Sequence, residues 1–191
     1  VSNSLDERLI QNLFLQGAQI DMFGVGERMI TAKSEPVFGG VYKLTAVEND
    51  KGEIIPKIKC SENVEKITIP HFKKVYRLYN KDNGKAIADY MTVHDEVVDE
   101  NEPLMLFDPY ATWKTKNVCN FEARELLVPV FLNGKKVYQS PTLKDIQAYC
   151  KQQVNTLWDE IKRFDNPQTY YVDLSQKLWD IQQELLRKNR N

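Results

Sequence analysis

The pattern of hydrophobic and polar positions divides the chain into three regions, residues 1–38, 39–140 and 141–191. The first and third regions place apolar residues at helical spacing, whereas the second alternates with a period of two. We therefore expect an α+β protein. It should hold the last βα units of an incomplete α/β barrel, then an antiparallel β-rich domain, and then a C-terminal helical pair.

The first region has the order of a parallel βαβ unit. Residues 1–3 resemble the exit of a strand, Ser4 and Glu7 fit a helix capping box, and Gly17 is a natural helix C-cap. The apolar residues 20–23 then predict a strand that ends in a glycine turn.

This order predicts a candidate anion site. Ligands of α/β barrels and doubly wound sheets bind at the carboxyl ends of the strands, so Ser2 and Asn3 should lie beside residues 24–27. Glycine lets a backbone approach a ligand closely, and several N–H groups aimed at one point bind an anion. The candidate ligands of a phosphate are Ser2, Asn3, Gly24, Val25, Gly26 and Glu27. A tight turn without a ligand explains a single G-x-G pattern equally well.

Arg28 follows the glycine turn directly and has two readings. Its guanidinium could reach a phosphate. It could equally form an ion pair with Asp21 or Glu27.

The second region predicts an antiparallel β layer. Strands are expected over residues 39–47, 74–79, 86–93, 104–107 and 122–130. Residues 81–84 should close a hairpin, and Asn133-Gly134 should turn a second one. Residues 95–102 are acidic and without pattern, which predicts a solvated loop. Five lysines make this region locally basic, as expected of a solvated sheet face: Lys57, Lys59, Lys66, Lys73 and Lys74.

The third region predicts two helices. Thr142 and Asp145 should form a capping box for the first, whose apolar stripe extends to Phe164. Asp173 or Ser175 should cap the second. Trp158 and Trp179 are expected to pack between these helices or onto the sheet.

Composition narrows the function. With 26 Lys and Arg, 27 Asp and Glu, and a net charge of −1, the chain lacks the basic balance of a nucleic-acid-binding protein. No apolar run approaches the roughly 20 residues of a membrane span, and no signal peptide is visible. Three cysteines, none in a C-x-x-C pair, predict reduced thiols of a cytoplasmic protein. The chain opens with Val1 in the middle of a pattern, so we expect a piece of a longer protein.

The residues of a reaction centre are not apparent. His71 and His94 are the only histidines, and neither has the spacing of a metal ligand or a nucleophile motif. No metal site and no catalytic residue is therefore predicted, and the histidines are expected to be structural or on the surface.

Several stretches resemble nicotinate phosphoribosyltransferase, in order along the whole chain. They are Phe23-Gly-Val-Gly26, Gly39-Gly-Val-Tyr-Lys-Leu44, Pro56-Lys-Ile-Lys-Cys-Ser-Glu-Asn63, Glu65-Lys-Ile-Thr68, Ala123-Arg-Glu-Leu-Leu-Val-Pro129 and Asp173-Leu-Ser-Gln-Lys-Leu-Trp179. The chain looks like the C-terminal part of a bacterial enzyme of this family.

The resemblance implies a function. The family joins nicotinate to 5-phosphoribosyl-1-pyrophosphate, releases pyrophosphate and hydrolyses ATP, with magnesium, in the salvage route to NAD. It implies cytoplasmic dimers that share active sites. Its 5′-phosphate site corresponds to Ser2-Asn3 and Gly24-Val25-Gly26. Glu27 departs from the pattern, because a small polar residue is expected there, so its backbone rather than its side chain should bind phosphate.

The resemblance also implies what this chain does not hold. The nicotinate pocket, the pyrophosphate contacts and the phosphorylated histidine belong to sequence upstream, so the chain alone is expected to be inactive. Leu9, Leu13, Ile20 and Phe23 would then lack a cover unless another chain packs there. Two alternatives stay open: a stand-alone β-rich interaction module, and a related phosphoribosyltransferase for quinolinate or nicotinamide.

Overall fold

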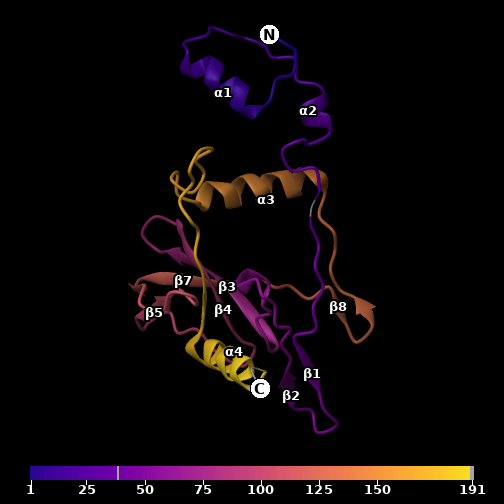
Figure 1. Cartoon of the computed structure of the whole chain (residues 1–191), viewed down its shortest axis with the longest axis vertical. Helices are drawn as coiled ribbons and strands as arrows, with labels where there is room; N and C mark the ends of the chain where they lie inside the picture. Colours follow the sequence, from indigo (N-terminus) through magenta and orange to yellow (C-terminus); the bar gives the residue numbers. More distant parts are fainter. Residues whose placement is uncertain (38, 190–191) are drawn as a thin grey trace. The chain divides into compact units, whose positions relative to one another are not determined.

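The computed structural model describes residues 1–37 and 39–189, which form two compact units. The smaller unit is Val1–Tyr42 and the larger is Lys43–Asn191 (Figure 1).

The smaller unit holds two helices, α1 (Glu7–Leu15) and α2 (Glu27–Ile30). The N-cap of α1 is Asp6, whose carboxylate accepts a hydrogen bond from the Leu9 N–H at 2.8 Å. The expected cap at Ser4 is therefore wrong, because Ser4 lies two residues too early and has a φ of 51°.

Gly17 ends α1 as predicted. Its N–H donates to the Phe14 carbonyl at 2.9 Å, and the Ala18 N–H donates to the Leu13 carbonyl at 3.0 Å. This is the Schellman arrangement, which requires the left-handed backbone that Gly17 adopts with a φ of 80°.

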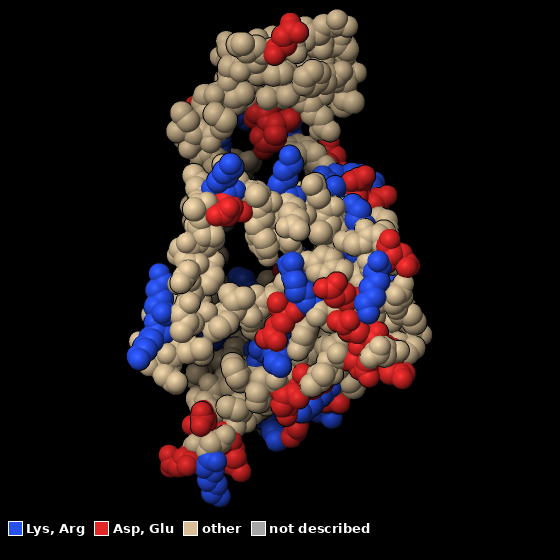
Figure 2. All heavy atoms as spheres, turned by 180° about the vertical axis from the view of Figure 1, so that it is seen from behind, with Lys and Arg blue, Asp and Glu red and all other residues tan. Residues whose placement is uncertain are grey.

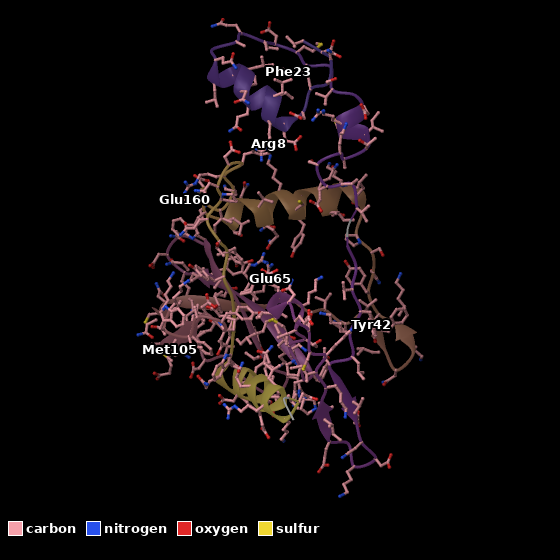
Figure 3. All side chains as sticks on the ribbon, in the orientation of Figure 1. Arg8, Phe23, Tyr42, Glu65, Met105 and Glu160 are labelled. Atoms are coloured by element: carbon pink, nitrogen blue, oxygen red, sulfur yellow. The ribbon has the colours of Figure 1, made fainter. Side chains whose placement is uncertain are left out.

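The strand expected over residues 20–23 does not form. Ser2 pairs with Gly24 in an isolated parallel bridge instead. Only one neighbouring segment is present in this unit, and a sheet needs more strands than that to be stable. Phe23 packs edge-on against Phe14 of α1, with ring centroids 5.5 Å apart (Figure 3).

Most apolar side chains of the smaller unit are in contact with solvent. Leu5 is buried, whereas Leu9 is exposed and Leu13, Ile20 and Phe23 are half-buried. Further side chains that are more than half exposed are Phe14, Leu15, Met22, Met29 and Ile30.

The larger unit is built on a four-stranded sheet of order β10-β4-β3-β7. Its strands are β3 (Lys73–Asn80), β4 (Ala86–Val93), β7 (Phe121–Glu125) and β10 (Val172–Leu174). The β3–β4 hairpin is confirmed, and its turn ends at Gly84 with a φ of 66°. β7 pairs with β3 antiparallel, as expected.

The edge strand β10 corrects the prediction of a purely antiparallel layer. It pairs with β4 in parallel, with Asp173 opposite Tyr90. The Asp89 N–H donates to the Tyr171 carbonyl at 3.0 Å, and the Ser175 N–H donates to the Met91 carbonyl at 2.8 Å. These bonds are long-range, so the local pattern could not predict the strand.

Three two-stranded sheets and a 3-10 helix complete the β region. They are β1 (Ala46–Glu48) with β2 (Ile54–Pro56), β5 (Leu104–Phe107) with β6 (Thr115–Val118), β8 (Phe131–Leu132) with β9 (Lys135–Lys136), and η1 (Val64–Lys66). The strand expected over residues 39–47 begins only at Ala46, and the one expected over 122–130 ends at Glu125. The turn at Asn133-Gly134 is confirmed, with φ of 49° and 75°.

The core lies against this sheet in two clusters. The first holds Tyr76, Leu78, Ala88, Tyr90, Leu106, Val118 and Phe121. The second holds Val93, Leu174 and Leu178, so it joins β4 to β10 and the last helix. Burying a large apolar side chain contributes about 2 kcal/mol, so these positions give the larger unit most of its stability.

The larger unit has two α-helices, α3 (Leu143–Thr156) and α4 (Gln176–Lys188). The capping box of α3 is confirmed, with Thr142 as N-cap and Asp145 as its partner. α3 ends at Thr156 rather than near Phe164, because Leu157 is already extended. Trp158 and Trp179 pack onto the sheet and its loops. The Trp158 indole donates to the Ala86 carbonyl at 3.0 Å, and the Trp179 indole donates to the Pro109 carbonyl at 3.1 Å.

Residues 95–102 form a loop with exposed side chains at 95, 97, 99, 101 and 102, as expected, but two of its carboxylates are bound by neighbouring elements. Glu96 accepts hydrogen bonds from the Val93 N–H and from the Ser175 hydroxyl, both at 2.7 Å. Glu100 accepts one from the Ala123 N–H at 2.8 Å. The carboxylates therefore satisfy donors of the sheet and of the α4 cap.

Removal of the α4 N-cap, Ser175, should destabilise the protein more than removal of the α3 N-cap, Thr142. It is buried, and its hydroxyl both accepts from the Leu178 N–H and donates to Glu96. Ser175→Ala should lower the free energy of unfolding by about 2 kcal/mol. Thr142→Ala, at the exposed cap of α3, should cost about 1 kcal/mol or less. Urea unfolding of both variants compares them, and equal losses would contradict the role of Glu96.

Candidate functional site

The predicted phosphate site lies in the smaller unit, where Ser2 and Gly24 meet as expected. The Gly24 N–H donates to the Val1 carbonyl at 2.8 Å, and the Val1 amino group donates to the Met22 carbonyl at 2.9 Å. A Cβ added at Gly24 would lie 3.2 Å from the Ser2 Cβ. Glycine at 24 therefore serves the close approach of two chain segments.

The turn after Gly24 leaves three backbone amides without a partner. Gly26 is the N-cap of α2, and its carbonyl accepts from the Met29 and Ile30 N–H groups at 3.0 and 3.1 Å. Within residues 1–37 and 39–189, the N–H groups of Val25, Gly26 and Glu27 donate to no acceptor. The first N–H groups of a helix have no partner within it, so these amides are left to solvent or to a ligand.

Gly26 has a local structural reason to be glycine. Its φ of −116° and ψ of −107° together lie outside the regions that residues with a side chain adopt, although an added Cβ would meet nothing within 4 Å. The space beside Gly26 is open, which is compatible with a ligand there and does not show one.

Asn3 and Ser4 carry unusual backbone angles at the other side of the turn. Their φ values are 88° and 51°, in a region that costs a non-glycine residue on the order of 1 kcal/mol. Strain of this kind clusters at functional sites. Asn120, Asn133 and Asn166 also have positive φ, and asparagine tolerates this region, so the angle at Asn3 does not by itself indicate a ligand.

The charged residues near the turn are engaged with each other. Arg28 forms an ion pair with Asp6, not with Asp21 or Glu27 as expected. The Glu27 carboxylate lies 3.7 Å from the Lys33 ammonium. The Glu27 side chain thus has a cationic partner of its own.

A hollow of about 340 Å³ lies beside the turn. It is lined by Asp6, Glu7, Ile10, Val25, Arg28, Met29, Ala32 and Ser34. Val25 is the one predicted site residue among these lining residues. The structure therefore brings Ser2 and Gly24 together, while the hollow opens on the side of α1 and α2.

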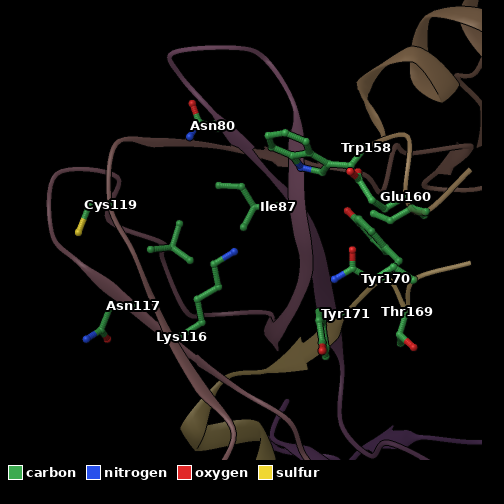
Figure 4. Close-up of a pocket in the computed structure, with 13 residues that line it drawn as sticks. Asn80, Ile87, Lys116, Asn117, Cys119, Trp158, Glu160, Thr169, Tyr170 and Tyr171 are labelled. Carbon is green, nitrogen blue, oxygen red and sulfur yellow. The ribbon is translucent and has the colours of Figure 1, made fainter.

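The larger unit has a wider cavity that the sequence did not predict. It has a volume of about 490 Å³ and lies between β4, β6 and residues 158–171. In Figure 4, Trp158 and Tyr170 lie on one side of it, and Lys116 points toward Ile87. Its walls come from residues 80–119 and 158–171, which are distant in sequence, so no local pattern indicates a shared cavity.

A second cavity of the larger unit contains a carboxyl group with a shifted pKa. Asp173 is buried, and burial together with the nearby Asp108 carboxylate raises the pKa of Asp173 to about 6. The sequence offered Asp173 only as a candidate helix cap, which proved to be Ser175. The residue lies in β10 instead.

In the basic stretch of residues 57–74, Lys57, Lys59 and Lys66 are exposed as predicted, whereas Lys73 is not. The Lys73 ammonium donates to the carbonyls of Ile69, Pro70 and His71 at 2.9, 3.3 and 2.7 Å. Burial lowers the pKa of Lys73 to about 8. Lys73 thus closes a turn, and it is not available to an anionic ligand. Figure 2 shows side chains of both charges over the larger unit.

The histidines and cysteines form no metal site in the part of the chain described. His71 and His94 stack with ring centroids 5.9 Å apart, and the buried His94 Nδ1 has no hydrogen-bond partner there. Within that part, no three His, Cys, Asp or Glu side chains are placed to hold a metal ion. The three cysteines, Cys60, Cys119 and Cys150, are free and exposed.

These features define an α+β protein whose smaller unit contains a glycine turn beside Ser2. Comparison with known proteins identifies the family. Residues 72–182 match the family model described as the nicotinate phosphoribosyltransferase C-terminal domain, and the chain belongs to this family. The resemblance found in the sequence is confirmed.

Proteins named nicotinate phosphoribosyltransferase match beyond that segment. The protein from Bacillus subtilis strain 168 is 44% identical over 178 residues, which cover 93% of this chain and 36% of that protein. The Caenorhabditis elegans protein is 34% identical over 190 residues, covering 98% of this chain and 33% of that protein. The chain thus spans about a third of the length of these relatives.

A solved structure shares the fold. The crystal structure of human nicotinic acid phosphoribosyltransferase matches with a TM-score of 0.69 at 22% identity, covering 97% of this chain and 32% of the human one. Among the described helices, none is both long and apolar enough to cross a bilayer.

Proposed function

We propose that this chain is part of a nicotinate phosphoribosyltransferase and holds the 5′-phosphate of phosphoribosyl pyrophosphate. The observation that carries the proposal is the match to this family along most of the chain, at 44% identity to the Bacillus subtilis protein. The unpartnered amides of Val25, Gly26 and Glu27 support it, because each can donate to a phosphate oxygen. Ser2 and Asn3 would add side-chain donors from the neighbouring segment.

The proposed reaction is a displacement at the C1′ carbon of the ribose. The ring nitrogen of nicotinate forms a bond to C1′, and the bond from C1′ to the pyrophosphate oxygen breaks. The products are nicotinate mononucleotide and pyrophosphate, and ATP hydrolysis drives the step. The product enters NAD synthesis by salvage of nicotinate.

The role of the chain in that reaction is positioning. A charge-assisted hydrogen bond to phosphate contributes about 1.5–3 kcal/mol, so several amides together fix one end of the substrate firmly. Fixing that end orients C1′ for attack and lowers the entropic part of the barrier. The Glu27 carboxylate would stay apart from the phosphate through its pairing with Lys33.

Magnesium and ATP belong to the proposed activity but have no assigned residues here. Within the described part of the chain, no set of three acidic, His or Cys side chains could hold a metal ion. The proposed role of this chain is therefore limited to binding the 5′-phosphate, and no residue of it is proposed to bind magnesium or ATP. The same proposal includes a cytoplasmic homodimer, in agreement with the exposed free cysteines and the uncovered apolar side chains of the smaller unit.

Expression of the complete reading frame tests the function. The purified product should form nicotinate mononucleotide from nicotinate and phosphoribosyl pyrophosphate, with release of pyrophosphate and faster turnover when ATP is present. It should elute as a dimer in size-exclusion chromatography. Quinolinate and nicotinamide serve as competing substrates. Faster turnover of either would support the related transferases instead, and no turnover of any would support an interaction module.

The 191-residue chain by itself should not catalyse the reaction. The residues proposed to bind phosphate hold one end of the substrate, and the described part of the chain offers no metal site beside the reacting carbon. An assay of nicotinate mononucleotide with the purified chain should give no signal above a blank. Turnover by the chain alone would overturn this expectation.

A further inference from the structure

The smaller cavity of the larger unit has the features of a separate binding site. It has a volume of about 180 Å³ and lies between β4, β5, β6 and β10. Its apolar wall is formed by Ile87, Ala88, Leu106 and Phe107. An engineered cavity of about 150 Å³ binds benzene, so the space is that of roughly one ring.

An unsatisfied carboxyl group lines this cavity. Asp173 is 5% exposed, and its Oδ1 has no hydrogen-bond partner within the described residues. Asp89, on the neighbouring strand β4, is in contrast bound by Arg77 and Tyr170. A buried carboxylate without a donor destabilises the empty protein, and a cationic donor would remove that cost.

The other charged groups of the cavity have a defined arrangement. Asp108 is half-buried, and its Oδ1 accepts from the Tyr110 and Ala111 N–H groups at 2.8 and 3.0 Å. Lys114 and Lys116 are exposed, and neither forms an ion pair with a described residue. The carboxyl groups thus lie deeper than the lysines.

We propose that this cavity binds a small zwitterion, with its ammonium or protonated nitrogen at Asp173 and Asp108 and its anionic group at Lys114 and Lys116. The body of the ligand, about the size of one ring, would lie on the wall of Ile87 and Phe107. Lys116 also lines the larger cavity (Figure 4), so an anionic group can reach it from the smaller one. The proposal is independent of the phosphate site of the smaller unit.

The proposal is tested by calorimetric titration of the full chain at pH 8 with three probes that share one benzene ring. The probes are benzylammonium, benzoate and 4-(aminomethyl)benzoate. The zwitterion should bind most tightly, benzylammonium more weakly, and benzoate without saturation. Asp173→Asn should weaken the binding of the zwitterion by about tenfold or more, a loss of about 1.4 kcal/mol. Lys116→Gln should weaken binding of the zwitterion but not of benzylammonium.

The Asp173→Asn variant also reports on its own folding. Since its side chain has no charge to bury, its midpoint of urea unfolding at pH 8 should be equal to or above that of the parent. If Asp173→Asn does not fold, Lys116→Gln tests the same site, because it changes an exposed side chain. Saturable binding of benzoate, an unchanged affinity in both variants, or no binding of any probe at about 10 mM would overturn the proposal. In the last case the Asp173 carboxyl is satisfied by water alone.

Discussion

Asp89→Ala should lower the free energy of unfolding of the 191-residue chain by about 3–5 kcal/mol. Asp89 is 9% exposed and receives two hydrogen bonds from the Arg77 guanidinium, at 2.8 and 2.9 Å. The Tyr170 hydroxyl donates a third, at 2.8 Å. Removal of the carboxylate leaves a guanidinium and a phenol without their acceptor in the interior.

The pKa shifts of the partners show how strongly the group is coupled. The hydrogen bond to Asp89 raises the pKa of Arg77 above its ordinary value. Burial, and next the charge of Asp89, raise the pKa of Tyr170. Both donors are thus held in their protonated forms, and the network joins β3 and β4 to the segment before β10.

Two control variants separate this effect from a general loss of charge. Asp95→Ala breaks the exposed pair with Lys177 and should lower the free energy of unfolding far less than Asp89→Ala does, because solvent screens that pair. The double variant Arg77→Met, Asp89→Leu replaces the pair by apolar side chains and should recover most of the stability lost in Asp89→Ala. Urea unfolding followed by circular dichroism gives all three values. A loss for Asp89→Ala no greater than that for Asp95→Ala would show that water replaces the carboxylate.

In the product of the complete reading frame, Gly26→Val should raise the KM for phosphoribosyl pyrophosphate about tenfold or more, equivalent to about 1.4 kcal/mol of binding. The reasons are added bulk and lost backbone freedom. The φ of −116° and ψ of −107° at Gly26 are unfavourable for valine, and an added Cβ meets nothing within 4 Å, so the side chain enters the open space beside the three amides. The kcat should change less than the KM, because the phosphate lies away from the reacting carbon.

Gly40→Val is the matched control, since an added Cβ at Gly40 also meets nothing within 4 Å. It should leave the KM unchanged. Urea unfolding of both variants measures the strain that valine adds at position 26, and a raised KM in a Gly26→Val protein that is still folded separates substrate binding from a folding defect. An unchanged KM for Gly26→Val would count against the phosphate site while leaving the family assignment intact.

Local sequence signals predicted the elements whose causes are local. The β3–β4 hairpin, the Asn133-Gly134 turn, the Thr142 capping box and the Gly17 helix end all form as expected. Each depends on backbone preferences or side-chain bonds within a few residues. The predicted proximity of Ser2 and Gly24 also holds, because the order of elements defines it.

Two wrong predictions, those for β10 and for Glu96, have a common physical cause. β10 was missed because its pairing with β4 joins residues about 80 positions apart, and Glu96 was assigned to solvent because its donors lie on other elements. Ser4 was predicted as the N-cap because Ser4 and Glu7 have the spacing of a capping box, but the helix begins at Glu7 and Asp6 caps it.

The sequence by itself determined the family, the local turns and caps, and the candidate phosphate residues, because backbone preferences and motif order are written in short stretches. Only the tertiary structure decided which charged groups are satisfied. It paired Asp89 with Arg77, directed Lys73 to carbonyl groups, and left Asp173 buried without a partner. Burial and hydrogen bonding depend on residues distant in sequence, so no local pattern contains them.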